Sequence, residues 1–180
     1  MVIFVQKFNS KGQFFSPDLT IAVGVFIFGL ALFLNASNSI FLQSDLLDAR
    51  KEADEVAHRA LNSLVLSSGS PSNWQDFTLS DINSFGLAKS PNFIDVSKIS
   101  ALILDLNSDV TYSSTKTKLG MAPYDFYFRF LDEGVLMNVD GLDLVGGRVA
   151  IDPKVKLTYQ RIVYVNGHSA VFEAIVSLSK

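Results

Sequence analysis

Residues 19–34 read LTIAVGVFIFGLALFL, and this apolar stretch decides how the rest of the chain can be organised. Thr20 is its only polar side chain, and it contains no charged residue. As an α-helix the stretch would span about 24 Å, slightly less than the ~30 Å hydrocarbon core of a bilayer. Small polar residues follow at 35–39, and the apolar residues 40–42 extend the segment to about 36 Å. The sequence therefore predicts a membrane-spanning helix over residues 13–42.

The residues before this stretch favour one orientation in the membrane. Residues 1–12 contain Lys7 and Lys11 and no acidic residue, so the positive-inside rule places this end in the cytoplasm. A secretory signal peptide is a competing interpretation, because Asn35-Ala36-Ser37 is similar to a small-residue cleavage site. The apolar run is at the upper length limit for such a signal, and Ser16-Pro17-Asp18 precedes it rather than a lysine. A buried core helix would need apolar partners on all sides, and the remaining chain is small.

The nine residues Lys11-Gly12-Gln13-Phe14-Phe15-Ser16-Pro17-Asp18-Leu19 lead directly into the apolar run. They resemble the class III leader of archaeal type IV pilins, in which a short basic leader ends in Lys/Arg-Gly and a prepilin peptidase cleaves before Gln. The resemblance implies that residues 1–12 are a leader peptide removed between Gly12 and Gln13, with the apolar helix retained on the mature protein. It also implies that residues of the new N-terminus take part in filament assembly, namely Phe14, Asp18 and Leu19.

The leader departs from the family pattern at one position. Type IV pilins usually have Glu at the fifth position of the mature chain, where it is thought to pair with the N-terminal amine of a neighbouring subunit. Here Pro17 is fifth and the acidic residue, Asp18, is sixth. Proline suits the first turn of a helix and Ser16 suits its N-cap, so the same residues predict that the helix starts here. Gly12 has no side chain and therefore suits an extended peptide entering a protease cleft.

Residues 44–66 read SDLLDARKEADEVAHRALNSLVL, and their apolar residues recur in steps of three and four. This spacing predicts an amphipathic helix. No strong helix breaker lies between Leu19 and Leu66, so one helix of about 48 residues is expected, ending at the turn-forming residues 67–73. In the pilin family the first half of such a helix joins a bundle and the second half packs under a sheet.

The rest of the chain predicts a short helix followed by strands. Asp95 or Ser97 can cap a helix that ends at Leu106, and the polar residues 107–120 are expected to form an exposed loop. Beyond this loop, the sequence predicts five strands, and Phe126, Phe128 and Phe130 of the first lie on one face. The strands are expected at 124–131, 135–139, 147–151, 157–165 and 170–178. The last two flank Asn166-Gly167, a strong signal for a β-hairpin.

This order of elements predicts an α+β fold, in which a long N-terminal transmembrane and amphipathic helix packs on a C-terminal antiparallel β-sheet. Residues 43–180 would form the extracellular α+β domain. Three further segments are similar to archaeal pilin-like proteins, namely Ser70–Trp74, Phe85–Ala88 with Lys98-Ile99, and Arg161–Gly167. With the leader, the resemblance touches most of the chain and implies a type IV pilin-like fold.

The composition excludes several chemistries. The chain has no cysteine, so disulfides, thiolate metal sites and cysteine nucleophiles are excluded. With 15 basic and 18 acidic residues it lacks the basic excess of a nucleic-acid binder. His58 and His168 have no metal-ligand spacing, and Asp140-Gly141-Leu142-Asp143 lacks the glutamate of a calcium-binding EF-hand loop. We expect no cofactor, no metal site and no catalysis.

Together these observations predict a structural subunit of a cell-surface filament, as the resemblance to type IV pilins implies, and a minor pilin in particular. Its expected partners are a prepilin peptidase, the membrane and other pilin subunits. The N-terminus would be cytoplasmic and the C-terminal domain extracellular, on a surface filament after assembly. The alternative is a single-pass anchored ectodomain that is never cleaved and that binds a ligand or a partner protein. A secreted enzyme is disfavoured because no catalytic constellation is present.

Overall fold

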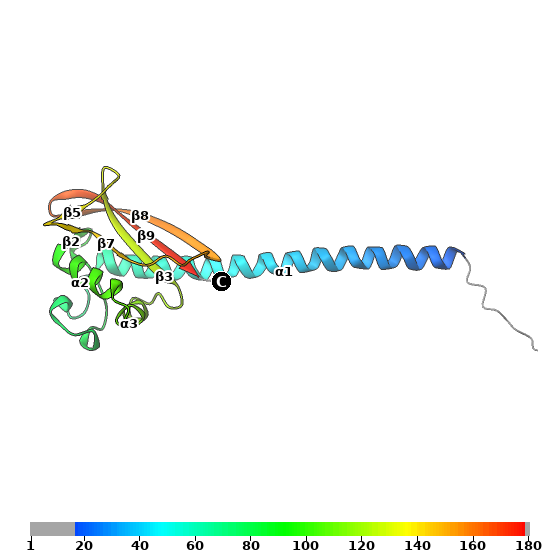
Figure 1. Cartoon of the computed structure of the whole chain (residues 1–180), viewed down its shortest axis with the longest axis horizontal. Coiled ribbons are helices and arrows are strands. Elements are labelled where there is room, and N and C mark those ends of the chain that lie inside the picture. The colour runs from blue at the N-terminus through cyan, green and yellow to red at the C-terminus, as the bar shows by residue number, and fades with distance from the viewer. Residues whose placement is uncertain (1–16, 179–180) are drawn as a thin grey trace, which may run out of the picture. The chain divides into compact units, whose positions relative to one another are not determined.

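The structure, a computed structural model, describes residues 17–178, apart from the side chains of residues 17 and 38–46. The chain is α+β and divides into two compact units. The first ends at Ser44, and the second, called the C-terminal unit below, begins at Asp45. Figure 1 shows the order of the elements, which runs from a long N-terminal helix through shorter helices to an antiparallel-rich sheet.

The long helix expected from the sequence is confirmed. α1 runs from Pro17 to Leu66, a length of 50 residues, and it continues through residues 35–39, where small polar side chains interrupt the apolar run. Asp18 lies in its first turn, where a carboxylate stabilises the positive end of the helix dipole. As expected, the helix ends just before the serine- and glycine-rich turn.

The main sheet has seven strands in the order β1-β2-β8-β9-β3-β4, with β7 also paired to β3. Their bounds are β1 Ala88–Ser90, β2 Phe93–Ile94, β3 Asp125–Asp132, β4 Val135–Leu136, β7 Val145–Gly147, β8 Val155–Val165 and β9 His168–Leu178. All of these pairs are antiparallel except β2 with β8. A separate antiparallel pair consists of β5 (Asn138–Val139) and β6 (Leu142–Asp143). The expected C-terminal antiparallel sheet is thus confirmed in its main part.

One face of the main sheet and the C-terminal part of α1 form the core of the C-terminal unit. Phe126, Phe128 and Phe130 of β3 are fully buried on this face, as their alternation predicts. An apolar stripe of α1 packs in the same core and consists of Ala53, Val56, Ala57, Ala60, Leu61, Leu64 and Val65. Because the chain contains no cysteine, burial of these side chains rather than a disulfide has to hold the unit together.

The hairpin of β8 and β9 forms as predicted around Asn166 and Gly167. Val165 pairs directly with His168, so the connection is a two-residue turn. Both turn residues have positive φ, 51° at Asn166 and 87° at Gly167. This conformation matches the right-handed twist of the strands, which explains why Asn-Gly is so frequent in such turns.

Of the two α-helices in the middle region, one confirms the sequence-based prediction and the other contradicts it. α2 spans Val96–Asn107, and the Asp95 side chain caps it by accepting a hydrogen bond from the Ser97 backbone N–H, as predicted. The prediction of an exposed loop over residues 107–120 is wrong, because α3 forms at Tyr112–Lys118. Its serines and threonines favour helix only weakly, but Tyr112 stabilises the helix, because its ring is buried and its hydroxyl donates to Asp125.

The weaker strands expected after β3 are also corrected. Residues 135–139 form two short strands in different sheets, β4 and β5, separated by Met137. The prediction of a strand at 147–151 is wrong, because the strand β7 ends at Gly147. After it, the Arg148 N–H still donates to the Phe126 carbonyl of β3, but the Ala150 N–H donates to the side-chain hydroxyl of Ser177 in β9 and not to a backbone carbonyl of the sheet. A glycine pair gives little local preference, so pairing with β3 decides where this strand lies.

Candidate assembly surfaces

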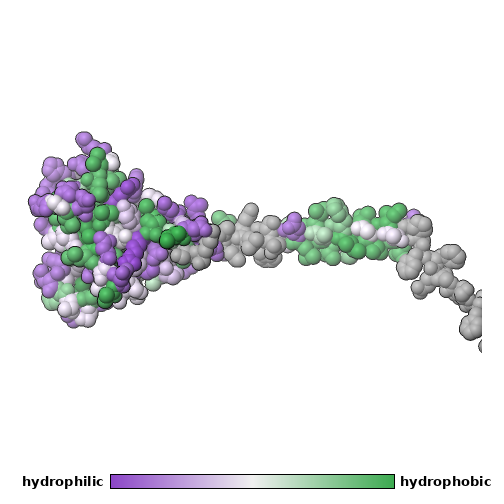
Figure 2. Space-filling model, in the orientation of Figure 1, coloured by the Kyte–Doolittle hydropathy of each residue, from purple (hydrophilic) through white to green (hydrophobic). Residues whose placement is uncertain are grey.

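The N-terminal part of α1 presents an apolar surface on all sides. From Asp18 to Ser37 the helix is long and apolar enough to cross a membrane, and none of this stretch is buried within the protein. The large apolar side chains between Leu19 and Leu34 are 44% to 69% exposed. In Figure 2 this stretch is green around most of its visible surface. A helix that is apolar on every side is stable in lipid or among other apolar helices, and it is costly in water.

Two glycines leave open places on this apolar helix. A Cβ atom added at Gly24 or Gly29 would have no other atom within 4 Å. Contacts within the chain therefore do not explain these glycines, although each costs about 1 kcal/mol of helix stability relative to alanine. Small residues at such positions let the backbone of a neighbouring helix approach closely.

Only some residues of the predicted processing and assembly site are among those that the structure describes. Lys7, Lys11, Gly12, Gln13 and Phe14 lie outside the described residues. Asp18 and Leu19 lie one after the other in the first turn of α1, and both side chains are exposed. The acidic side chain is therefore placed where it could reach a positive group on a neighbouring molecule.

Backbone hydrogen bonds connect the end of α1 to the residues that precede β1 and β2. The backbone N–H groups of Leu87 and Asn92 donate to the carbonyls of Leu64 and Val65, at 2.8 and 3.1 Å. The buried Lys98 ammonium donates to the Ser68 carbonyl at 2.8 Å, and burial lowers the pKa of Lys98. These bonds satisfy carbonyls that would otherwise be unpaired at the end of the helix.

Side chains of the sheet also bind the polar edge of α1. The Tyr159 hydroxyl donates to the Asp54 carboxylate at 2.6 Å, and Arg161 donates to the Asn62 amide oxygen at 2.8 Å. Burial, followed by this hydrogen bond to Asp54, raises the pKa of Tyr159. The helix is thus fixed to the sheet in rotation as well as in position.

On the opposite face of the sheet, one buried carboxylate forms a polar network with its two neighbouring strands. Glu173 accepts hydrogen bonds from Arg129 at 2.6 Å and from Gln160 at 2.8 Å, and its side chain is only 8% exposed. The hydrogen bond from Gln160, and then that from Arg129, lowers the pKa of Glu173 below its ordinary value of 4.5. The network links β3, β8 and β9 at mid-sheet.

We expect Glu173→Gln to make the C-terminal unit less stable at neutral pH. The hydrogen bonds to the charged carboxylate predict a loss of about 1.5 kcal/mol in the free energy of unfolding, because Arg129 is 41% exposed and partly screened. The carboxylate's contribution is complete above pH 4.5 and is lost as the pH falls through the lower folded-state pKa. Urea unfolding at pH 7 and pH 3 should therefore show a difference from the wild type only at pH 7. Glu133→Gln, at an exposed turn, serves as the control, and an equal difference at both pH values would contradict the prediction.

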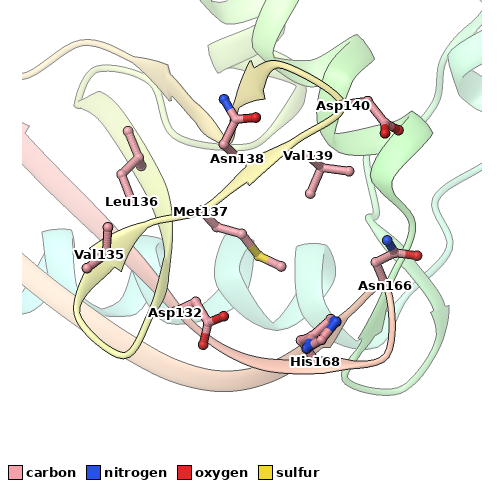
Figure 3. A pocket seen from close by; sticks show the side chains of 9 residues that line it. All are labelled: Asp132, Val135, Leu136, Met137, Asn138, Val139, Asp140, Asn166 and His168. Atoms are coloured by element: carbon pink, nitrogen blue, oxygen red, sulfur yellow. The ribbon is translucent and has the colours of Figure 1, made fainter.

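A hollow on the C-terminal unit lies between the β4–β5 segment and the β8–β9 turn (Figure 3). It has a volume of about 500 Å³ and is lined by Asp132, Val135, Leu136, Met137, Asn138, Val139, Asp140, Asn166 and His168. His168 is exposed, as expected for a residue beside the turn. Among the described residues, no group of three or more His, Asp or Glu side chains could hold a metal ion. The hollow therefore offers a surface of carboxylate, amide, imidazole and apolar side chains.

No family model, curated protein or solved structure matches this chain. Function is therefore inferred from the residues and the geometry of the chain itself.

Two surfaces were not found by sequence reasoning, namely the Glu173 network and the apolar row across the outer face of the sheet, described below. The sequence does contain one signal for the network. Glu173 interrupts the apolar run Ala170–Leu178 at a position that pairs with Gln160 on one side and Arg129 on the other. Strand pairing and register, which the sequence of single strands does not specify, were needed to find it.

Proposed function

We propose that this chain is a structural subunit of a type IV pilus-like surface filament, and a minor pilin in particular. It is made as a membrane-held precursor, cleaved between Gly12 and Gln13 by a prepilin peptidase, and assembled through its apolar helix. Its C-terminal unit faces the outside of the cell. In this proposal the chain catalyses no reaction.

The observation that carries the proposal is the continuity of α1. Its first part is apolar on every side, and its last part, from Ala53 onward, supplies one wall of the core of the C-terminal unit. A simple membrane anchor does not need a helix that continues without interruption into the folded unit. A filament subunit does, because its helix has both to pack among like helices and to carry the folded unit.

Packing against like helices provides the driving force for assembly, because the helix of a membrane-held precursor leaves lipid rather than water. The apolar residues between Leu19 and Leu34 have no partner within the described chain, and the open places at Gly24 and Gly29 let another helix approach closely. The exposed Asp18 at the helix N-terminus supports the proposal as well, because the amine of a neighbouring subunit would neutralise it.

The direct test is the N-terminus of the mature protein. The full chain is expressed with a cognate prepilin peptidase, and intact-mass and peptide mass spectrometry determine where the mature chain begins. We expect a chain that begins at Gln13, in native or cyclised form. An intact Met1 would favour the uncleaved membrane anchor, and a start near Ser37 would indicate a secreted protein.

We expect Gly12→Leu to reduce processing from nearly complete to nearly absent. A bulky side chain next to the cut cannot enter a cleft that accepts glycine, so the precursor should accumulate in the membrane. Gln6→Leu, a change within the leader but away from the cut, is the matched control and should be processed normally. The readout is the ratio of precursor to mature chain on immunoblots, with filaments counted by electron microscopy. Normal processing of Gly12→Leu would count against a pilin-type leader.

A further inference from the structure

An apolar row crosses the outer face of the sheet, on the side away from α1. Leu136, Leu131, Val171 and Ile162 are direct register partners on β4, β3, β9 and β8. Next to them, Phe93 of β2 stacks on Tyr164 of β8, with ring centroids 5.0 Å apart. We call these six residues the tip row, because they lie toward the end of the sheet that carries the Asn166–Gly167 turn.

Three apolar or aromatic side chains of the tip row are strongly exposed to solvent. Ile162 is 72% exposed, Phe93 52% and Tyr164 43%. The tip row consists of six residues, whereas each partner of a stable interface contributes roughly 20–30 residues. The tip row is therefore too small to hold a dimer by itself, but it suits a contact between molecules that another element already holds together.

The opposite end of the sheet carries two protruding apolar side chains. Ile151 is 95% exposed and Val110 is 88% exposed. Their loops are joined by the ion pair of Arg148 and Asp109, and the Ala150 N–H binds Ser177 near the end of β9. We call Val110 and Ile151 the base knob. The eleven residues of β8 separate this end from the tip by about 35 Å.

The two ends also differ in charge. The exposed Asp132 and Glu133 lie beside the tip row, at the end of β3 and in the turn that follows it. The exposed Lys154 and Lys156 follow the base knob at the start of β8, and Asp152 in the same loop offsets one of these charges. A contact between two tips would bring negatively charged side chains together. A contact between a tip and a base would instead place negative side chains next to positive ones.

We infer that the base knob of one copy docks on the tip row of the next copy, so that the C-terminal units contact one another head to tail. The inference rests on the proposed function, because the apolar helices have to hold the copies at high effective concentration for so small a contact to form. Such a contact joins two different surfaces and does not close on itself, which is the geometry that generates a filament. The partner is a second copy of this chain.

Cysteine crosslinking of the full chain tests the inference, because the sequence contains no native cysteine. The double variant Ile151→Cys with Ile162→Cys is produced in cells that process and assemble the chain, and sheared filaments are treated with a short bis-maleimide. Both positions are highly exposed, so folding should be unaffected. We expect a ladder of dimers, trimers and longer products on denaturing gels. A mixture of the two single variants should give dimers only.

The matched control replaces Ile151 and Phe77 with cysteine, because Phe77 is exposed at 47% but belongs to neither surface. Filaments that crosslink no better than this control would overturn the head-to-tail contact while leaving the proposed function intact. Failure to process or to form filaments would instead count against the proposed function itself.

A charge exchange gives a second, independent measurement. We expect Lys154→Glu with Lys156→Glu to abolish the ladder, and adding Asp132→Lys with Glu133→Lys to restore it. Restoration requires that the two ends face each other, which a general loss of stability would not reproduce. A ladder that is insensitive to both sets of changes would overturn the assigned surfaces.

Discussion

Gly86→Ala is expected to unfold the C-terminal unit or nearly so. A Cβ atom at this position would collide with the backbone of Ser67 and Gly69, which cannot yield as a flexible side chain would. The Gly86 carbonyl also accepts the indole N–H of Trp74 at 2.7 Å, and the Trp74 ring packs edge-on against Phe85. We expect the free energy of unfolding to fall by about 4 kcal/mol or more, a loss that single substitutions rarely cause.

The measurement uses Trp74, the only tryptophan, which is 1% exposed and reports unfolding through its fluorescence. Urea unfolding of the full chain in detergent compares the wild type, Gly86→Ala and the control Gly134→Ala. Gly134 has a positive φ of 85° but nothing within 4 Å of an added Cβ, so the control should lose only about 1 kcal/mol. Equal losses in the two variants would contradict the steric explanation.

Ile27→Lys is expected to remove the chain from the membrane and from filaments. This residue lies near the middle of the apolar stretch from Asp18 to Ser37 and is 59% exposed. A lysine at the centre of a spanning helix costs about 3 kcal/mol, which corresponds to more than a hundredfold change in an equilibrium. Carbonate extraction of membranes measures the inserted fraction, and electron microscopy measures filaments.

Ala36→Lys is the matched control, because it introduces the same side chain near the end of the same stretch. A lysine there can extend its ammonium toward the lipid headgroups, so insertion should be close to that of the wild type. If the two variants behaved alike, depth in a membrane could not be the cause, and the apolar helix would need another partner.

The elements predicted best are those whose sequence pattern is local and strong. The length of α1 follows from the absence of a breaker, and the β8–β9 hairpin follows from Asn166-Gly167 between two apolar runs. The alternation of β3 also identified its buried face. In each case the residues that decide the structure lie within one continuous segment of the chain.

The elements that were predicted wrongly depend on contacts between distant residues. α3 is stabilised by Tyr112, whose hydroxyl donates to Asp125 at 3.0 Å and whose pKa burial raises to about 12. β7 is placed by its pairing with β3, although its Gly146 and Gly147 carry no strand signal of their own. Propensity within a short window does not contain this information, because tertiary packing overrides it.

The candidate assembly surfaces also differ in how much of each the sequence predicts. The apolar helix was evident from residues 19–34 alone, since its chemistry is a property of composition. The tip row required the register of five strands, because residues such as Leu131, Ile162 and Val171 are ordinary strand residues until pairing aligns them on one face. Charged residues at the two ends became complementary only once the direction of β8 was known.

The position of β9 in the sheet has a consequence for how the protein is made. β9 lies between β8 and β3, and it is the last of the described strands to be synthesised. A chain interrupted before His168 would leave the phenylalanines of β3 without their main neighbour, and pairing of β3 with β9 closes a long loop. The C-terminal unit therefore folds only after β9 has been synthesised, so chains interrupted before β9 expose apolar surface that cellular quality control can recognise.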